Sequence, residues 1–433
     1  MSKRKALALG LVLAAIVTTA VVRAETIAIT GGTVHTLGPQ GSISGASVLI
    51  QGGQISAVGK NVVIPEGATR IDASGKVVTS GFFDSYSYIG VEEISLVEET
   101  VDNAYKGERY SAAFNVRDAI NPHSTLIPIN RTEGVTRAMV APMTPYGLEQ
   151  GHVIRGLGAS ITLRTDRTAL DNSRAALFVQ LGEIGAKLTG GSRAAATLTL
   201  REALDDAMDY ARNKRAFNAG QRREYSLSRL DLEALGQALR NEIPMVLQVD
   251  RASDIQVAIG LGIEFDVRVI ILGGAEAWMV ADELATARVP VILDPMENLP
   301  GRFESLGATL ENAGRLNTSG VAIAFATSNS HNARNLKQAA GNAVSYGLPF
   351  IEALRALTVN PATMYGIADS YGTLEVGKAA DVVVWSGDPL EVTTFADHVF
   401  VAGEAVPMES RSTKLRDRYF DLDDELPPAY RNR

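Results

Sequence analysis

The chain of 433 residues contains no cysteine, and this absence removes several kinds of chemistry. Disulfide bonds, thiolate ligands to zinc and cysteine nucleophiles are all excluded. Histidine is scarce as well, and the chain has only five: His35, His123, His152, His331 and His398. None of them lies between residues 153 and 330, so the middle of the chain cannot supply an imidazole to any site.

Clustered positive charge is also missing. The net charge of −8 argues against a nucleic-acid-binding surface, which needs gathered lysine and arginine, so we expect no nucleic-acid partner. Beyond the first 24 residues, no apolar run reaches the roughly 18 residues of a membrane span. We therefore expect no membrane span in the mature protein.

The N-terminal segment is typical of a signal peptide over residues 1–24. Lys3, Arg4 and Lys5 precede the apolar stretch ALALGLVLAAIVTTAVV, and the small residues Val22 and Ala24 suit signal peptidase. An uncleaved anchor is the alternative, but a run this short followed by a cleavage pattern favours removal. We expect an exported protein, periplasmic in a two-membrane bacterium.

Short β runs divided by glycine occupy both ends of the chain. TIAITGGTVHTL and ASVLIQGGQISAVG alternate apolar and polar residues around glycine turns, which is typical of hairpins, and GTLEVGKAADVVVWSGDP has the same texture. These segments predict a composite β-sandwich built from residues 25–75 and 373–410. Residues 411–433 are left as a C-terminal tail.

The pattern changes between residues 76 and 372, where apolar strands alternate with helical stretches. The strand-like segments are nearly continuous in apolar residues, as buried parallel strands are: VTRAMVAP, AALFVQLG, PMVLQVD, VRVIILGG, VPVILDP and GVAIAFAT. Repeated β-then-α units over this length predict an α/β fold, a (β/α)8 TIM barrel.

Residues 194–240 interrupt this rhythm with a long, charged, helical stretch. Its basic cluster, RNKRAFNAGQRREYS, could serve as a partner surface. Runs of charge are more often the solvated face of a helix, and we predict a helical insertion.

The layout resembles the amidohydrolase superfamily, in particular its imidazolonepropionase-like branch. The resemblance covers essentially the whole mature chain and rests on ITGGTVHTL, IDASGKVVTSGFFD, VILDPMENLP, SHNARNL, ALRALTVNPATMYGI and GTLEVGKAADVVVWSGDPL. It implies hydrolysis of non-peptide C–N bonds in an amide, cyclic amide or dipeptide-like substrate. It also implies one or two divalent metals, usually zinc, at the C-terminal end of the barrel.

The residues at the metal-ligand positions of that family are substituted here. The first-strand His-x-His pair is Tyr86 and Tyr88, and the fifth-strand segment LQVDRA offers Gln248 and Asp250. The sixth strand ends in glycines, and Ser328 stands in place of the eighth-strand aspartate. The best match to the fourth-strand ligand is Glu183. We therefore expect no zinc, and no other cofactor.

A polar pocket remains at these positions. Asp84, Tyr86 and Tyr88 follow one another at period two and share one side of their strand, as do Gln248 and Asp250 on theirs. These side chains could merely fill the vacated space, or bind a ligand, or retain catalysis. Asp84, Asp250 and Glu183 would suit a hard ion such as Mg²⁺ or Ca²⁺ better than zinc.

The segment SNSHNARNL, after the eighth predicted strand, is a second candidate. Ser330, His331 and Arg334 stand where a helix begins, and free backbone N–H groups there favour an anion. Ser330 could instead be the N-cap of that helix, which is the more frequent role.

Two functions therefore stay open. The first is a hydrolase-family protein with a remodelled, metal-free pocket and weak or lost activity, taking a small-molecule ligand for which a carboxylate-bearing compound is one candidate. The second is a non-catalytic periplasmic protein that uses the barrel for ligand binding or assembly. A homo-oligomer is compatible with both, and fold kinship alone cannot choose between them.

Overall fold

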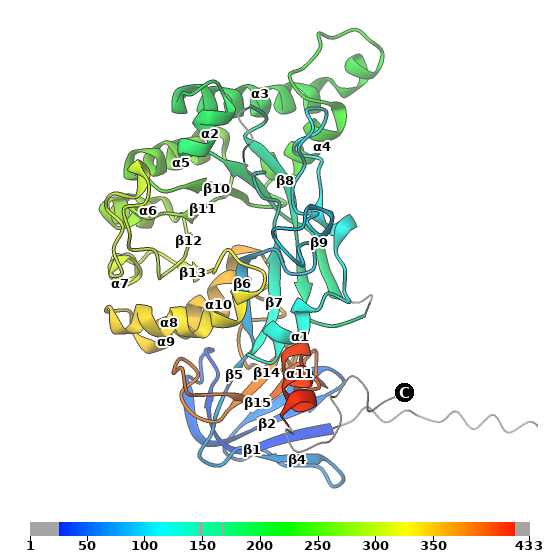
Figure 1. Ribbon diagram of the computed structural model, residues 1–433, viewed down its shortest axis with the longest axis vertical. Helices are drawn as coiled ribbons and strands as arrows, with labels where there is room; N and C mark the ends of the chain where they lie inside the picture. The colour runs from blue at the N-terminus through cyan, green and yellow to red at the C-terminus, as the bar shows by residue number, and fades with distance from the viewer. Residues whose placement is uncertain (1–25, 146, 148–149, 167–168, 421–433) are drawn as a thin grey trace, which may run out of the picture.

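The computed structural model describes residues 26–420, apart from 146, 148–149 and 167–168 (Figure 1). The predicted signal peptide and the last part of the predicted tail lie outside the described residues. Among the helices that are described, none is long and apolar enough to span a membrane. Two eight-stranded sheets organise this part of the chain.

The first sheet contains strands from both ends of the chain, as predicted. Its strands run in the order β16-β15-β14-β5-β1-β2-β3, with β4 paired to another part of β1. Their bounds are β1 Thr26–His35, β2 Ser42–Gln51, β3 Gln54–Gly59, β4 Thr69–Asp72, β5 Val77–Ser80, β14 Val382–Trp385, β15 Ala396–Val401 and β16 Glu404–Ala405.

The strand β5 joins the two halves of this sheet. It pairs in parallel with β1 and antiparallel with β14, so residues 77–80 belong to the sheet, although the predicted boundary placed them with the barrel. The side chains on one face, among them Ile29, Val48, Val384 and Phe400, are almost fully buried and form a separate apolar core. This alternation of buried residues is the pattern that predicted the strands.

The second sheet forms the barrel, in the order β13-β12-β11-β10-β9-β8-β7-β6. The end strands β6 and β13 contact each other, so the barrel is nearly closed. The bounds are β6 Phe82–Ser87, β7 Val135–Val140, β8 Ile154–Thr162, β9 Leu170–Gln180, β10 Met245–Val249, β11 Val269–Gly273, β12 Val291–Leu293 and β13 Ile323–Phe325.

The predicted barrel is confirmed, with one difference in strand direction. The strand β8 runs antiparallel to both of its neighbours, β7 and β9, while the other strand pairs of the barrel are parallel. Because β8 is reversed, its first residues lie at the edge of the barrel where the parallel strands end.

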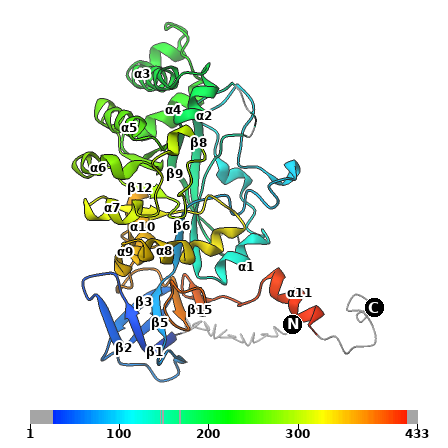
Figure 2. The same ribbon diagram turned by 60° about the vertical axis from the view of Figure 1, so that its left-hand side comes forward.

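Helices lie along the outside of the barrel, with α5, α6 and α7 beside β10, β11 and β12, and the terminal sheet lies at one end of the molecule (Figures 1 and 2). Their bounds are α1 Leu126–Arg131, α2 Gly182–Leu188, α3 Arg193–Asn218, α4 Arg229–Leu239, α5 Ala252–Phe265, α6 Ala281–Ala287, α7 Asn312–Thr318, α8 Leu336–Ser345, α9 Phe350–Ala356, α10 Val359–Met364 and α11 Arg411–Tyr419. The helix α11 lies in the predicted tail.

The charged stretch 194–240 corresponds closely to α3 and α4. These helices bury Leu200, Leu204 and Leu235 in the main apolar core, so they form part of the barrel's outer layer. Their charged residues pair with one another: Lys214 Nζ of α3 lies 2.9 Å from Glu233 Oε1 of α4. These pairs agree with the prediction of a helical, charged segment.

A buried tryptophan connects the sheet domain to the barrel. Trp385 Nε1 donates a hydrogen bond to Thr79 Oγ1 at 2.9 Å, and its ring stacks on Phe82 at the start of the first barrel strand. Nearby, Arg137 Nε of β7 donates to Asp381 Oδ2 at 2.7 Å, with both side chains buried. Asp381 is the last residue of the motif GKAAD, so this motif anchors the barrel to the sheet.

Candidate functional site

A cavity of about 470 Å³ opens where the parallel strands of the barrel end. Gln248, Asp250 and Ser328, which the sequence placed at the mouth of the barrel, all line it. In α/β barrels the active site lies at this end, because the loops after the strands converge there. Ser328 has a φ of 50°, in the left-handed region that residues other than glycine seldom adopt. This cavity is the candidate functional site.

An arginine from the loop after β12 enters the site and binds the fifth-strand aspartate. Arg302 Nη2 lies 2.7 Å from Asp250 Oδ2, and its Nη1 lies 3.0 Å from Glu304 Oε1. Asp250 Oδ1 accepts a further hydrogen bond from the backbone N–H of Ala275 at 3.3 Å. Both oxygens of this buried carboxylate are therefore occupied by donors of the protein itself.

The pKa values of the carboxyl groups at this site are raised above their ordinary values. Burial raises the pKa of Asp250 to about 6; Glu297 contributes to the rise, and Arg302 opposes it. Burial also raises the pKa of Asp294, Glu297 and Glu304. A group of carboxyls with raised pKa values in a cleft is a recognised mark of a functional site.

The aspartate and tyrosines of β6 lie in the barrel interior, apart from this cavity. Tyr86 is 4% exposed, and its ring packs against Phe178 within an apolar cluster. Tyr88 Oη donates a hydrogen bond to Tyr86 Oη at 2.9 Å. Asp84 is fully buried, one of its oxygens has no hydrogen-bond partner, and burial raises its pKa to about 8. Asp84 is therefore neutral near pH 7.

Glu183 also lies away from the mouth cavity. It stands at the start of α2, where its Oε1 is 3.5 Å from Arg193 Nη2. Its backbone N–H donates to Glu304 Oε2 at 2.6 Å. Glu183 is thus linked to Glu304 by this backbone contact and through Arg193, whose Nη2 also lies 3.5 Å from Glu304 Oε2.

The predicted anion-binding residues after β13 do not line this cavity. Ser330 is buried, and its hydroxyl donates to Glu92 Oε1 at 3.2 Å, so it makes no cap on the following helix. His331 is exposed, with Nδ1 3.2 Å from Asn332 Oδ1, and Arg334 is half-buried. The three residues are close in sequence, but the structure gives them no shared pocket.

The residues at the mouth do not fit zinc. Both oxygens of Asp250 are engaged by Arg302 and Ala275, and Asp84 does not line the cavity. Across the described residues, no three or more His, Asp or Glu side chains form a group that could hold a metal ion. Asp84, Asp250 and Glu183 are not gathered around one position either, so they do not form the oxygen-only site considered above.

A local steric contact explains why the sixth barrel strand ends in glycine. Gly273 has a φ of 96°, and a Cβ placed there would collide with Oδ1 of Asp250. Any side chain at this position, including a metal-binding histidine, would have to displace the buried carboxylate. Substitution at the sixth strand is therefore coupled to the presence of Asp250 on the fifth.

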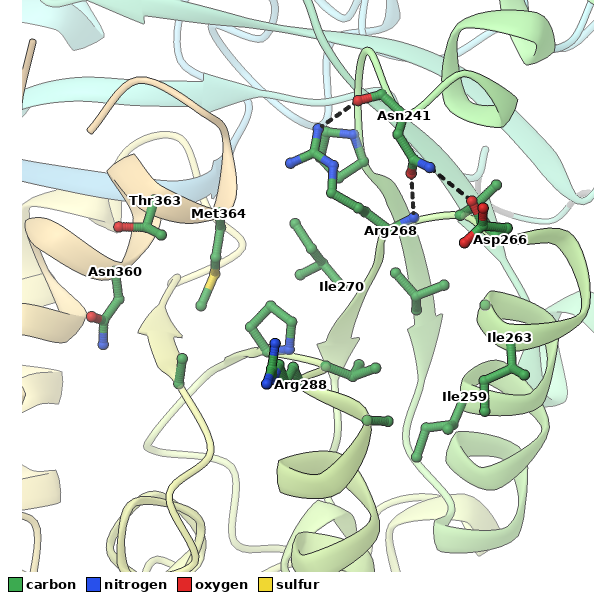
Figure 3. Close-up of a pocket in the computed structure, with 18 of the residues that line it drawn as sticks. Asn241, Ile259, Ile263, Asp266, Arg268, Ile270, Arg288, Asn360, Thr363 and Met364 are labelled. Atoms are coloured by element: carbon green, nitrogen blue, oxygen red, sulfur yellow. Dashed lines mark hydrogen bonds between the residues drawn. The ribbon is translucent and has the colours of Figure 1, made fainter. Parts of the chain in front are cut away.

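A larger cavity of about 920 Å³ lies at the opposite end of the barrel (Figure 3). It is lined by residues that precede or begin the strands, such as Arg268 and Pro290, and by Met364 of α10. Arg268 Nη2 there donates to the Asn241 carbonyl at 3.2 Å. This end of a (β/α)8 barrel ordinarily serves stability, and the raised carboxyl pKa values belong to the other end.

Three residues of the mouth were missed in the sequence. Asp294 directly follows β12, so the strand-end rule that identified Asp250 could have found it. Glu297 and Arg302 arrive on the loop beyond β12, and no periodicity signals the direction of a loop side chain. Sequence patterns therefore identify residues at strand ends better than loop residues that fold back over those ends.

Comparison with known proteins agrees with this architecture. A solved structure of an amidohydrolase from Thermotoga maritima MSB8 matches with a TM-score of 0.78 and 28% identity, covering 88% of this chain and 99% of that one. The model of the amidohydrolase family matches residues 203–406. The fold is thus that of a hydrolase barrel with a composite β domain.

Two curated relatives extend the comparison. The amidohydrolase tasK of Hapsidospora irregularis is 24% identical over 387 residues, which is 83% of this chain and 39% of that protein. An imidazolonepropionase of Sphingopyxis alaskensis is 39% identical over 100 residues, or 22% of this chain and 25% of that protein. The chain therefore spans well under two thirds of the length of these relatives. It belongs to the amidohydrolase superfamily, with the residues at the metal-ligand positions substituted.

Proposed function

We propose that the barrel mouth binds a small amide, cyclic amide or dipeptide-like molecule and hydrolyses its C–N bond through side chains. The observation that carries the proposal is the buried pair of Asp250 and Arg302 inside a cavity of about 470 Å³. Membership of the amidohydrolase superfamily supports the C–N bond as the target. The donor set at the mouth, which does not fit zinc, supports a reaction carried by side chains.

Asp250 is the proposed general base. A pKa of about 6 leaves it mostly ionised at neutral pH and keeps it close to the operating pH, where proton transfer is most effective. Each carboxylate oxygen has a second lone pair, and through one of these Asp250 would take a proton from a water molecule as that water forms a C–O bond to the amide carbon. It would then return the proton to the nitrogen as the C–N bond breaks.

Arg302 is the proposed electrostatic partner. Its guanidinium is fixed by two carboxylates and is about one-third exposed, so its positive charge borders the cavity. A fixed cation beside a carbonyl oxygen stabilises the negative charge that develops there during hydrolysis. Asp294 and Glu297 line the same cavity and would accept hydrogen bonds from the N–H groups of a ligand.

The test is a hydrolysis assay on chelator-treated protein. N-acyl amino acids, cyclic amides and dipeptides would be incubated with the protein, and amine release would be followed by NMR. We expect turnover that chelator does not reduce and that Asp250→Asn abolishes. Asp266→Asn is the matched control, because it makes the same change at the other end of the barrel. Loss of turnover on chelation, or full turnover in Asp250→Asn, would reject this mechanism.

A second candidate is a non-catalytic assembly protein, and the loop after β12 favours it. Met296, Leu299, Phe303 and Leu306 are all exposed there, with Phe303 at 83% and Leu299 at 71%. A group of exposed apolar side chains often marks a protein–protein interface. A second copy of this chain is the partner that can be tested directly.

The oligomeric state separates this candidate from the first. If the loop forms an interface between copies, Leu299→Ser with Phe303→Ser should convert an oligomer to a monomer in sedimentation experiments. Val63→Ser is the matched control, because Val63 is 86% exposed and lies in the terminal sheet domain. A wild-type monomer at high concentration would reject assembly between copies.

We also propose that the protein acts outside the cytoplasm, because residues 1–24 are typical of a cleaved signal peptide. N-terminal sequencing of the exported form should find Glu25 as its first residue. A start many residues away would reject the predicted cleavage site.

A further inference from the structure

A largely buried arginine, Arg155, stands at the start of the reversed strand β8. Ile154 pairs with Val179 of β9, and Gly156 pairs with Phe178, so Arg155 is an extra residue in a β-bulge. Bulges often re-aim a side chain beside a functional site. The Arg155 side chain is largely buried, and its Nε has no hydrogen-bond partner.

In the part of the chain that the structure describes, no carboxylate forms an ion pair with Arg155, and its buried Nε has no hydrogen-bond partner. Burial lowers the pKa of Arg155 to about 10, and the phenol of Tyr86 acts in the opposite direction. The group therefore stays positively charged at neutral pH. Buried charges in proteins are normally paired, because leaving water without compensation is costly.

Arg155 lines a small cavity of about 90 Å³. Ser111 lines the same cavity, and its hydroxyl oxygen is a second buried atom without a hydrogen-bond partner among the described residues. The backbone N–H of Ser111 donates to Asp231 Oδ1 at 2.8 Å, which fixes the loop that carries it. His152 lies on the cavity wall, and its Nε2 donates to the carbonyl of Glu108 at 2.9 Å. Two lining residues of the cavity, Arg155 and Ser111, thus each carry a buried polar atom without a hydrogen-bond partner in the described part of the chain.

We propose that this cavity binds the carboxylate group of a small molecule, with Arg155 and Ser111 as its donors. A guanidinium offers two parallel N–H groups that match a carboxylate, and a serine hydroxyl can donate a further hydrogen bond. The volume exceeds the roughly 30 Å³ that one water occupies in the liquid, and suits an acid group rather than a whole large ligand. A bound carboxylate would supply a negative charge that none of the described residues provides through an ion pair with Arg155.

This site is separate from the Asp250 pocket and does not depend on the proposed hydrolysis. Counted around the barrel with β6 as the first strand, β8 is the third strand and β12 is the seventh. Arg155 belongs to β8 and Arg302 to the loop after β12, so the two cavities lie on opposite sides of the barrel. The cavity lies beside the loops that connect β6 to β7 and β7 to β8. Failure of one proposal therefore leaves the other standing.

Ligand-observed NMR with acetate tests the proposal. Saturation transfer to the acetate methyl should be seen with the full-length protein, whereas the neutral isostere acetamide should give none. Arg155→Met should weaken acetate binding by about tenfold or more, because a hydrogen bond to a charged group contributes that much. Arg70→Met is the matched control, because Arg70 is exposed on β4 of the terminal sheet and its loss should not change binding.

Thermal denaturation distinguishes a ligand-binding arginine from a structural one. Without acetate, Arg155→Met should melt at the same temperature as wild type or higher, because it removes an uncompensated buried charge. A lower melting temperature would indicate a structural role and overturn the proposal. If Arg155→Met does not fold, Ser111→Ala serves instead and should weaken acetate binding. Equal response to acetate and acetamide, or preference for inorganic phosphate over acetate, would also overturn it.

Discussion

Arg302 lies 2.7 Å from Asp250 and uses its other terminal nitrogen to reach Glu304 at 3.0 Å. One guanidinium therefore compensates two carboxylates whose side chains are only 5% and 3% exposed. In most members of a metal-dependent family a divalent ion would provide the positive charge at a barrel mouth. Here the Arg302 side chain provides the positive charge. The stability of the site should therefore depend on the pair of Arg302 and Asp250.

Removal of Arg302 should destabilise the protein more than the loss of a surface ion pair. In Arg302→Met, Asp250 remains buried without its counter-charge. Glu304 keeps the pair with Arg193, whose Nη2 is 3.5 Å from its Oε2. We therefore expect unfolding to become easier by about 2 kcal/mol at pH 7. The value is set below that of a fully buried pair because Arg302 is 38% exposed. Urea denaturation measures the change.

Two further variants show whether the effect is electrostatic. Adding Asp250→Asn to Arg302→Met should recover part of the lost stability, because the unpaired charge is then gone. Arg201→Met breaks an exposed pair with Glu264 and should cost at most about 0.5 kcal/mol. Additive single and double changes would contradict the coupling of Asp250 and Arg302.

The buried carboxyl of Asp84 predicts a pH-dependent stability. Its pKa is about 8 in the folded protein and about 4 when unfolded, so the folded state holds the proton to higher pH. That contribution is fully present below pH 4 and is lost as the pH rises towards 8. Asp84→Asn does not titrate, so its stability relative to wild type should increase over this interval.

Urea denaturation at pH 5, 6.5 and 8 measures this difference. All other titrating groups are shared by the two proteins and cancel, and linkage limits the slope to about 1.4 kcal/mol per pH unit. We expect the advantage of Asp84→Asn to grow from pH 5 to pH 8 and to level off above. A constant difference would mean that Asp84 is ionised in the folded protein.

The parallel barrel strands were predictable from the sequence because each is a short, continuous apolar run. The strand β8 was not, since its sequence IRGLGASIT contains glycines that suggest a turn. In the structure those glycines permit close packing: a Cβ at Gly156 would collide with the Phe114 carbonyl, and one at Gly158 with the Phe178 ring. Periodicity also carries no information on strand direction.

The candidate site, like the barrel, was predictable only in part. Gln248, Asp250 and Ser328 follow strands, so the rule that parallel strands end at one edge brought them together correctly. Arg302 and Arg155 were not predictable, because one returns on a loop and the other belongs to the reversed strand. Their importance depends on which carboxylates lie near them, and that is a property of the folded chain.

Gly273 should tolerate no side chain, because the buried carboxylate of Asp250 occupies the adjacent space. Gly273→Ala adds both a collision with Asp250 Oδ1 and backbone strain at a φ of 96°, and we expect a loss of about 2 kcal/mol or more. Gly260→Ala, at an open position of α5, should instead stabilise by about 0.5 kcal/mol or more. If Asp250→Ala does not relieve part of the Gly273→Ala defect, the collision is not its cause.

The donor set at the mouth predicts a protein that does not hold zinc. Mature protein purified without added metal should carry far less than one zinc per chain by elemental analysis, and chelator should not change its melting temperature. Zinc in proteins is held by Cys, His, Asp and Glu side chains, whereas Tyr86 and Tyr88 stand in the positions of the family's histidines. Asp250 is already bound to Arg302.

Restoring the first-strand histidines alone should not restore zinc binding. A double variant, Tyr86→His with Tyr88→His, still has Gln248, Gly273 and Ser328 on the other strands, which leaves zinc short of the three protein ligands that a catalytic site uses. About one tightly held zinc, iron or manganese per wild-type chain, lost together with stability on chelation, would overturn the assignment. The ligands would then have to include a histidine such as His152, whose Nε2 would need to leave the Glu108 carbonyl.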